Sequence, residues 1–220
     1  MEIVVINASP RKSGNTAALC DTFVEGVRAA DPSIGCRRTD LYDLHFQGCR
    51  SCFACKERDG RFYGRCCLAD DLAPLLERIA AADGLAVGSP IYLGSIPGLL
   101  KAFYERLLFA KTTYEAGYRT LARRIPVQTL YTMNMTPEAA AAAGVDAGIA
   151  QIEGFLGHLY LPPHRLTAYD TMQFADEHRY RIEVYSPEAK RARREREFPQ
   201  LLAEARTAGE AMARQCLGRA

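Results

Sequence analysis

The chain has 220 residues, of which 48% are hydrophobic and 25% are charged, so its composition is that of a globular protein with one sizeable core. A formal net charge of +2 argues against nucleic acid as a main partner. No apolar stretch is long enough to span a bilayer, and the acidic Glu2 with the strand-like run after it is unlike a secretory signal. We therefore expect a cytoplasmic protein with no membrane partner.

The chain opens with an apolar run, Ile3–Ile6, that is typical of a buried strand, and apolar residues at helical spacing follow over Thr16–Ala30. The loop between them, Asn7–Thr16, is rich in hydroxyl and amide side chains. Backbone N–H groups at a helix N-terminus, together with such hydroxyls, bind phosphate. The loop has neither the nucleoside triphosphate motif nor the dinucleotide motif, so it predicts a site for one terminal phosphate. A turn with a helix cap is the alternative interpretation.

Strand and helix signals then alternate along the chain. Further strands are expected at 36–41, 85–88, 126–131 and 164–169, and helices at 70–82, 97–110 and 137–159. A long Gly- and Cys-rich connection without a clear period occupies 45–69. Apolar strands that alternate with helices predict a parallel sheet with helices on both faces, which binds its ligand at the carboxyl ends of the strands.

Residues 186–218 read as a highly charged helix. Its basic residues alternate with glutamates, which predicts a solvated helix face for Lys190, Arg191, Arg193, Arg194 and Arg196. We therefore expect a domain over 1–175, with a Cys-rich insertion at 45–69, and a charged helical extension of the same domain over 176–220.

A second loop, Gly88–Ser95, follows the strand expected at 85–88. Its segment Pro90–Gly94 predicts an extended backbone with an apolar or aromatic face and little steric bulk, as a flat ring system requires. An ordinary turn between a strand and a helix is the alternative.

Together, the loops 7–16 and 88–95 resemble those of the NAD(P)H-dependent FMN reductase branch of the flavodoxin-like superfamily. The cysteine segment resembles that of the iron–sulfur flavoproteins in the same branch. The resemblance covers residues 1 to about 170. It implies a flavodoxin-like three-layer sandwich: a five-stranded parallel sheet of order 2-1-3-4-5 with helices on both faces, and noncovalently bound FMN.

The resemblance also implies roles for the matching positions. Those that would hold the FMN phosphate are Ser9, Arg11, Ser13, Gly14, Asn15 and Thr16. Those that would lie along the isoalloxazine ring are Pro90, Ile91, Tyr92, Leu93 and Gly94. Thr132 and Met133 would flank the ring from the next strand end. No catalytic side chain is expected, because the flavin itself carries the chemistry.

Five of the eight cysteines lie close together in the sequence: Cys49, Cys52, Cys55, Cys66 and Cys67. The spacing of the first three suits an iron–sulfur cluster. The resemblance implies a fourth cysteine ligand, for which Cys66 is our candidate and Cys67 the alternative, although the gap before them is longer than in those relatives. A 4Fe-4S cluster, a structural zinc site, a redox-active thiol pair and simple reduced thiols all stay open.

The expected function is NAD(P)H-dependent reduction of a flavin, quinone or other small acceptor by bound FMN. The alternative is an electron carrier in which FMN and a 4Fe-4S cluster relay electrons between protein partners such as a ferredoxin-type protein. Apolar residues at 93–97 and 107–109 predict a homodimer or homotetramer. In the expected strand order the segment 49–67 crosses the first loop, so we expect it beside the flavin.

Overall fold

A five-stranded parallel sheet forms the centre of the computed structural model, which describes residues 1–117, 119–174, 176 and 179–219. The strands are β1 (Glu2–Asn7), β2 (Gly35–Asp40), β3 (Gly84–Pro90), β4 (Val127–Thr132) and β5 (His164–Ala168). Their order in the sheet is β2-β1-β3-β4-β5, and every neighbouring pair is parallel. The predicted fold class and strand order are confirmed.

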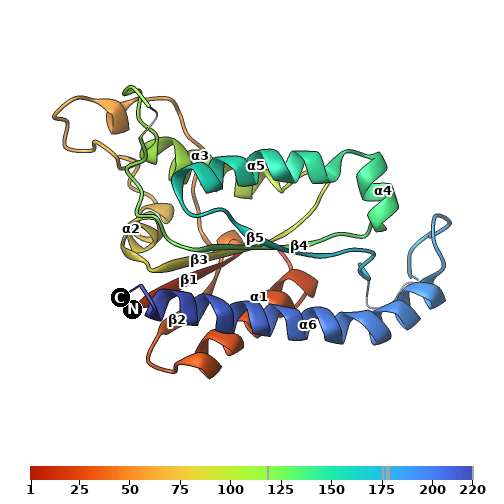
Figure 1. Cartoon of the computed structure of the whole chain (residues 1–220). Coiled ribbons are helices and arrows are strands. Elements are labelled where there is room, and N and C mark those ends of the chain that lie inside the picture. Colours follow the sequence, from red (N-terminus) through yellow and green to blue (C-terminus); the bar gives the residue numbers. More distant parts are fainter. Residues whose placement is uncertain (118, 175, 177–178, 220) are drawn as a thin grey trace.

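Helices cover both faces of this sheet (Figure 1). On one face lie α1 (Asn15–Ala30) and α6 (Pro187–Leu217), and on the other lie α2 (Leu72–Ala81), α3 (Gly98–Lys111) and α5 (Val145–Leu159). The remaining helical elements are the short α4 (Pro137–Ala142) and the 3-10 turns η1 (Leu41–Asp43) and η2 (Ala54–Lys56). Within the described residues, we find no helix that combines the length and the apolar character needed to cross a membrane.

The inner strands are buried on both sides, which explains their continuous apolar runs. In β1, Ile3 and Val5 pack with the core beneath α1 and α6, whereas Val4 and Ile6 pack with the core beneath α2, α3 and α5. All four side chains are fully buried.

The helix expected over 137–159 is interrupted. The first helix, α4, ends at Ala142, and Gly144 adopts a left-handed conformation with φ of 70° before α5 begins. Glycine reaches this conformation without the steric cost that other residues meet, so one continuous helical signal becomes two helices.

The charged C-terminal helix packs closely along α1. A Cβ atom placed on Gly26 would lie 2.0 Å from the Arg206 carbonyl oxygen, and one on Gly209 would lie 2.2 Å from the Phe23 carbonyl oxygen. The two backbones therefore touch, and this contact depends on the absence of side chains at both positions. The expectation that the basic face of this helix is solvated is wrong for Lys190, which is 3% exposed.

We expect Gly209→Ala to lower the free energy of unfolding by about 2–4 kcal/mol, because the new methyl group forces α1 and α6 apart. Gly154→Ala in α5 is the matched control, since no described heavy atom lies within 4 Å of a Cβ placed there. The control should gain about 0.5–1 kcal/mol from helix propensity. Denaturant unfolding of both variants checks the prediction, and equal stabilities would contradict it.

Candidate functional site: the cavity at the carboxyl edge of the sheet

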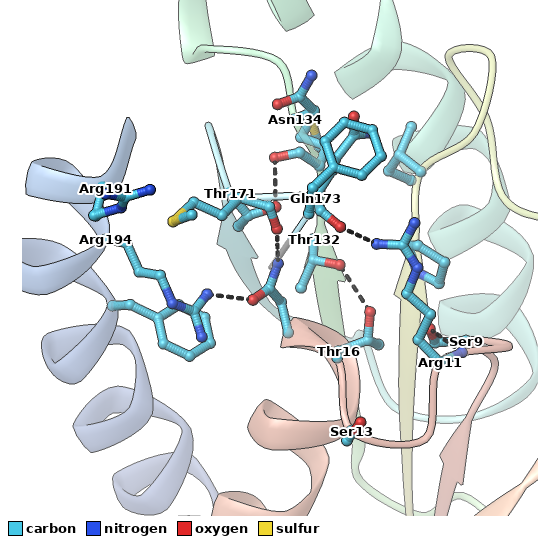
Figure 2. A pocket seen from close by; sticks show the side chains of 18 of the residues that line it. Ser9, Arg11, Ser13, Thr16, Thr132, Asn134, Thr171, Gln173, Arg191 and Arg194 are labelled. Carbon is cyan, nitrogen blue, oxygen red and sulfur yellow. Dashed lines mark hydrogen bonds between the residues drawn. The ribbon is translucent and has the colours of Figure 1, made fainter. Parts of the chain in front are cut away.

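A cavity of about 1000 Å³ lies at the carboxyl ends of the strands. Figure 2 shows most of the residues that line it. The first loop contributes Ser9, Arg11, Ser13, Gly14, Asn15 and Thr16, the second contributes Pro90, Ile91 and Tyr92, and the end of β4 contributes Thr132 and Met133. Eleven of the thirteen residues predicted to hold the cofactor thus come together.

The first loop is held in place by its own polar groups. The Asn7 side chain donates to Asp40 Oδ1 at 2.7 Å and accepts the Ser9 N–H at 3.2 Å. The Ser9 hydroxyl in turn accepts the Arg11 N–H at 3.2 Å. Ser9 and Asn7 are nearly inaccessible to solvent, so the loop conformation is fixed from the end of β1 onward.

The N-terminus of α1 points into this loop. In the described part of the chain, its N-cap residue Gly14 makes no side-chain cap, which leaves the first N–H groups of the helix for a ligand. Thr16, 2% exposed, shares a hydrogen bond of 2.7 Å with the Thr132 hydroxyl and so connects the loop to β4. The loop has the open N–H groups and hydroxyls that phosphate binding requires.

The second loop ends in a tight turn outside the cavity. Tyr92 and Ser95 exchange backbone hydrogen bonds of 2.7 and 3.0 Å, and Leu93 and Gly94 at the tip have positive φ angles of 51° and 78°. Leu93 and Gly94 are not among the described residues that line the cavity, and the Leu93 side chain is fully exposed.

Apart from Asn134, which follows β4, the remaining wall comes from residues 171–199, which the sequence did not connect with the site. The additional lining residues are Asn134, Thr171, Met172, Gln173, Phe174, Tyr180, Arg191, Arg194, Glu195, Phe198 and Pro199. Thr171 to Phe174 directly follow β5, so they lie at the same sheet edge as the two loops. Their position after a parallel strand was the sequence signal that they belong to the cavity lining.

The five clustered cysteines gather at a second place in the molecule. All five line a small cavity of about 20 Å³ next to α3, and the Cys52 and Cys67 sulfurs are 3.5 Å apart. The Ala54 N–H and the Cys67 thiol hydrogen-bond to the Cys52 sulfur and lower the pKa of that thiol, whereas the contact with Cys52 raises the pKa of Cys67. Among the described His, Cys, Asp and Glu side chains, no group of three or more is arranged around a single metal ion.

Arg106 of α3 anchors the connection that carries these cysteines. Its side chain is fully buried and donates to Asp70 Oδ2 at 2.5 Å, to the Gln47 and Leu68 carbonyls at 3.2 Å, and to Cys66 Sγ at 3.3 Å. Sequence reasoning missed this residue. The sequence signal for a buried cation was its position one turn after Phe103, on the face of α3 that is otherwise apolar.

The expectation that the cysteine segment lies beside the loops expected to hold the flavin is wrong. Among the described residues that line the large cavity there are no cysteines. Figure 1 shows the connection, drawn in orange, at the other end of the sheet from α4. The physical reason is that it runs back along α3, where Lys56 donates to the Thr112 carbonyl at 2.5 Å beyond the end of that helix.

The family model for the flavodoxin-like fold matches residues 1–185. The chain belongs to this family. An iron-sulfur flavoprotein of Methanocaldococcus jannaschii is 32% identical over 106 residues, which are 48% of this chain and 51% of that protein. An FMN-dependent NADH:quinone oxidoreductase of Alcanivorax borkumensis is 31% identical over 156 residues, which are 67% of this chain and 74% of that protein.

The NAD(P)H:quinone oxidoreductase from Methanothermobacter marburgensis is a solved structure of the same fold, with a TM-score of 0.67 at 19% identity and 96% coverage of each chain. The alignments with the iron-sulfur flavoproteins of M. jannaschii and Methanosarcina thermophila span about half the length of those relatives. The resemblance inferred from the two loops is confirmed.

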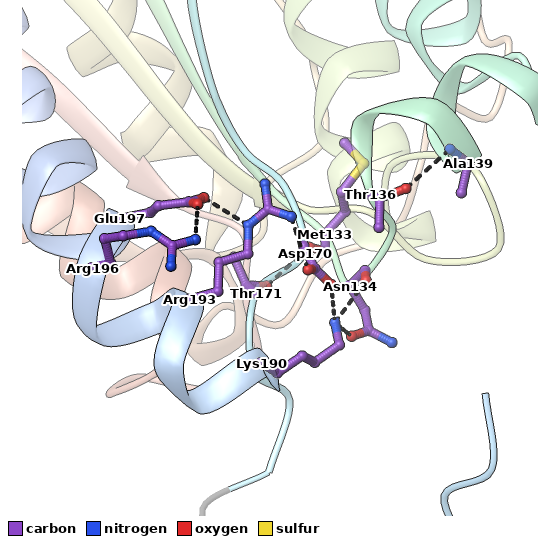
Figure 3. A network of polar contacts seen from close by, with 10 residues as sticks. All are labelled: Met133, Asn134, Thr136, Ala139, Asp170, Thr171, Lys190, Arg193, Arg196 and Glu197. Atoms are coloured by element: carbon purple, nitrogen blue, oxygen red, sulfur yellow. Dashed lines mark hydrogen bonds and ion pairs between the residues drawn. The ribbon is translucent and has the colours of Figure 1, made fainter. Parts of the chain in front are cut away.

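In this flavodoxin-like chain, Lys190 fastens α6 to the sheet edge that bears the cavity (Figure 3). Its ammonium group donates to the Asn134 carbonyl at 2.9 Å and to the Asn134 side chain, and it pairs with Asp170 Oδ1 at 2.5 Å. It also lies 4.5 Å from the ring centroid of Tyr185. Arg193 pairs with the other Asp170 oxygen at 3.0 Å, so two cations of α6 hold the residue that follows β5 by two positions.

We expect Lys190→Met to lower the free energy of unfolding by about 2–4 kcal/mol, because it leaves the partly buried acceptors of Asp170 and Asn134 with fewer donors. Arg214→Met on the same helix is the control: Arg214 is 62% exposed and lies 3.6 Å from Glu210. The control should change the free energy by about 0.5 kcal/mol or less. Urea unfolding measures both values, and an effect of Lys190→Met no larger than the control would refute the anchoring role.

Proposed function

We propose that the large cavity binds FMN and that the chain is an oxidoreductase, which uses NAD(P)H to reduce a flavin, a quinone or another small acceptor. The observation that carries this proposal is the pairing of a phosphate-type loop with an extended apolar segment on one cavity wall. Quinone and FMN appear in the name of the A. borkumensis relative, which supports the same reading.

The residues present fit FMN. The cavity of about 1000 Å³ has room for the cofactor together with part of a second ligand, since ligand pockets commonly measure roughly 300–1,000 Å³. The α1 N-terminus and the Ser9, Ser13 and Thr16 hydroxyls would hold the phosphate. Pro90 and Ile91 would lie along the ring, and Met133 would pack at its flank.

When bound, FMN supplies the hydride-accepting and electron-donating chemistry, so the chain need only bind, orient and shield. Ile91 N–H donates to the Thr132 carbonyl at 2.9 Å, which fixes the extended segment against the end of β4. Tyr92 is 41% exposed at the cavity mouth, where a donor or acceptor would enter.

We also propose that residues 1–175 and the extension 176–220 act as one FMN-binding domain, because α6 supplies part of the cavity wall. A homodimer or homotetramer is supported by the exposed Tyr92 and Leu93 beside the cavity. Leu107 gives no such support because it is buried. A cytoplasmic location would suit eight cysteines that act as thiols or ligands, since they require a reducing compartment.

We expect Thr16→Val to weaken FMN binding about tenfold while the fold is kept, because it removes a hydroxyl donor to a charged phosphate. Thr22→Val, on the same helix but outside the described cavity lining, should leave FMN binding unchanged. Titration of the apoprotein with FMN, followed by quenching of flavin fluorescence, gives both affinities. A wild-type chain that binds FAD or no flavin would overturn the proposed function.

A second candidate function is electron transfer through FMN and a 4Fe-4S cluster, and the gathering of five cysteines around one small cavity favours it. Arg50, Arg58, Arg61 and Arg65 are exposed on the same connection, with Phe53 half-exposed beside them. Such a basic and aromatic surface would suit an acidic protein partner of the ferredoxin type. The name of the M. jannaschii relative supports this candidate as well.

The combined substitution of Cys49, Cys52 and Cys55 by Ser tests this candidate. We expect loss of iron and acid-labile sulfide from anaerobically purified protein, with FMN retained, because serine does not replace thiolate in an iron–sulfur cluster. Cys216→Ser is the control, since Cys216 is buried and donates to the Asp83 carbonyl at 3.2 Å. A wild-type protein without iron and sulfide would leave the reductase as the function, and zinc in the same metal analysis would identify a structural site.

A further inference from the structure

A cation near the first loop would strengthen the binding of a phosphate dianion there, and the two cations of that loop are already paired with other groups. The Arg11 guanidinium donates to the Gln173 carbonyl, at the far side of the cavity mouth. The Lys12 ammonium pairs with Asp43 at 2.6 Å, and its side chain is 57% exposed. A cation from another part of the chain would add charge-assisted hydrogen bonds to those of the helix N-terminus and the loop hydroxyls.

Arg194 of α6 is placed to supply such a cation (Figure 2). Its guanidinium donates to the Asn15 side-chain oxygen, at the first residue of α1, and lies 4.4 Å from the ring centroid of Phe198. The Asn15 amide in turn donates to the Met172 carbonyl at 2.8 Å. Arg194 is thus held by two contacts beside the open helix N-terminus.

The charge of the surrounding wall points the same way. Arg191 lies almost one turn before Arg194 on α6 and also lines the cavity, and Glu195 is the acidic residue among the described lining residues. The described residues that line this cavity thus include three arginines, counting Arg11, and one carboxylate. An arginine guanidinium forms two parallel hydrogen bonds with a phosphate, which a lysine does not.

We propose that Arg194 binds the FMN phosphate, so that α6 supplies the cation of the flavin phosphate site from beyond the residues matched by the family model. This inference rests on the proposed function, because it concerns the same cavity and cofactor. In this proposal Arg194 contacts the phosphate directly, in addition to its contact with Asn15.

The test compares FMN with riboflavin, which has the same ring but no phosphate. Arg194→Gln removes the charge and keeps a side chain that hydrogen-bonds to Asn15. We expect it to weaken FMN binding roughly tenfold or more, as loss of a charge-assisted hydrogen bond implies, and to change riboflavin binding by about twofold at most. Arg194→Lys should weaken FMN binding less, because it keeps the charge without the planar fork.

Arg196→Gln is the matched control, since Arg196 is 67% exposed and pairs with Glu197 at 2.9 Å. Both affinities should equal those of the wild type in this variant. Thermal unfolding of each apoprotein shows whether the variants are folded. If Arg194→Gln does not fold, the ratio of FMN to riboflavin affinity in Arg194→Lys tests the role of Arg194 instead. A fall of this ratio with added salt in the wild type is the second measurement.

An unchanged ratio in a folded Arg194 variant, or an equal loss for both flavins, would overturn this inference and leave the proposed function standing. A wild-type chain that binds neither flavin would overturn both. A ratio that falls in Arg194→Gln and stays at the wild-type value in Arg196→Gln would establish the role of Arg194.

Discussion

The backbone contact between α1 and α6 is the constraint on which the site depends. Gly26 and Gly209 let the two helices approach until a methyl group at either position would collide with a carbonyl oxygen of the other helix. Because α6 is a single helix from Pro187 to Leu217, its contact with α1 at Arg206 and Gly209 also constrains the direction of its first turns. Those turns pass the carboxyl edge of the sheet, where Lys190 joins them to Asp170 and Asn134. The close approach of α1 and α6 at these two glycines therefore helps to determine where the wall of the cavity lies.

Arg106 anchors the connection that carries the cysteines in the same way that Lys190 anchors α6. Both are cations inside the protein, and both collect acceptors from segments that have no regular structure of their own. Because these cations are removed from water, their N–H groups must find acceptors within the protein, and the loss of such a contact lowers stability. At these two places, a charged residue rather than an apolar one thus holds an irregular segment against the layered core.

The strands and the two loops could be predicted because their signals are local. Ile3–Ile6 is apolar throughout as it is buried on both faces, and Ser13 to Thr16 stand at the start of a helix. The break at Gly144 was missed because the alanines on its N-terminal side carry an uninterrupted helical signal. Lys190 was expected at the surface because its acceptors lie 20 and 56 residues away in sequence, so no local pattern indicates them. Likewise, the spacing of the cysteines indicated a common site, yet it did not indicate which helix would hold that site.

The separation of the two sites bears on what the chain can do alone. The large cavity is walled by α1, α6 and the ends of β1, β3 and β4, whereas the cysteines are held by α3 on the opposite face of the sheet. Substitutions at distant sites without shared partners act independently. Flavin binding and metal binding are therefore separable properties of this fold: the cavity needs none of the five cysteines to keep its shape, and the cysteine cavity needs none of the phosphate loop. The proposed reductase chemistry requires the first site alone, whereas a relay through FMN and a cluster requires both, so the content of the cysteine site distinguishes the two candidate functions.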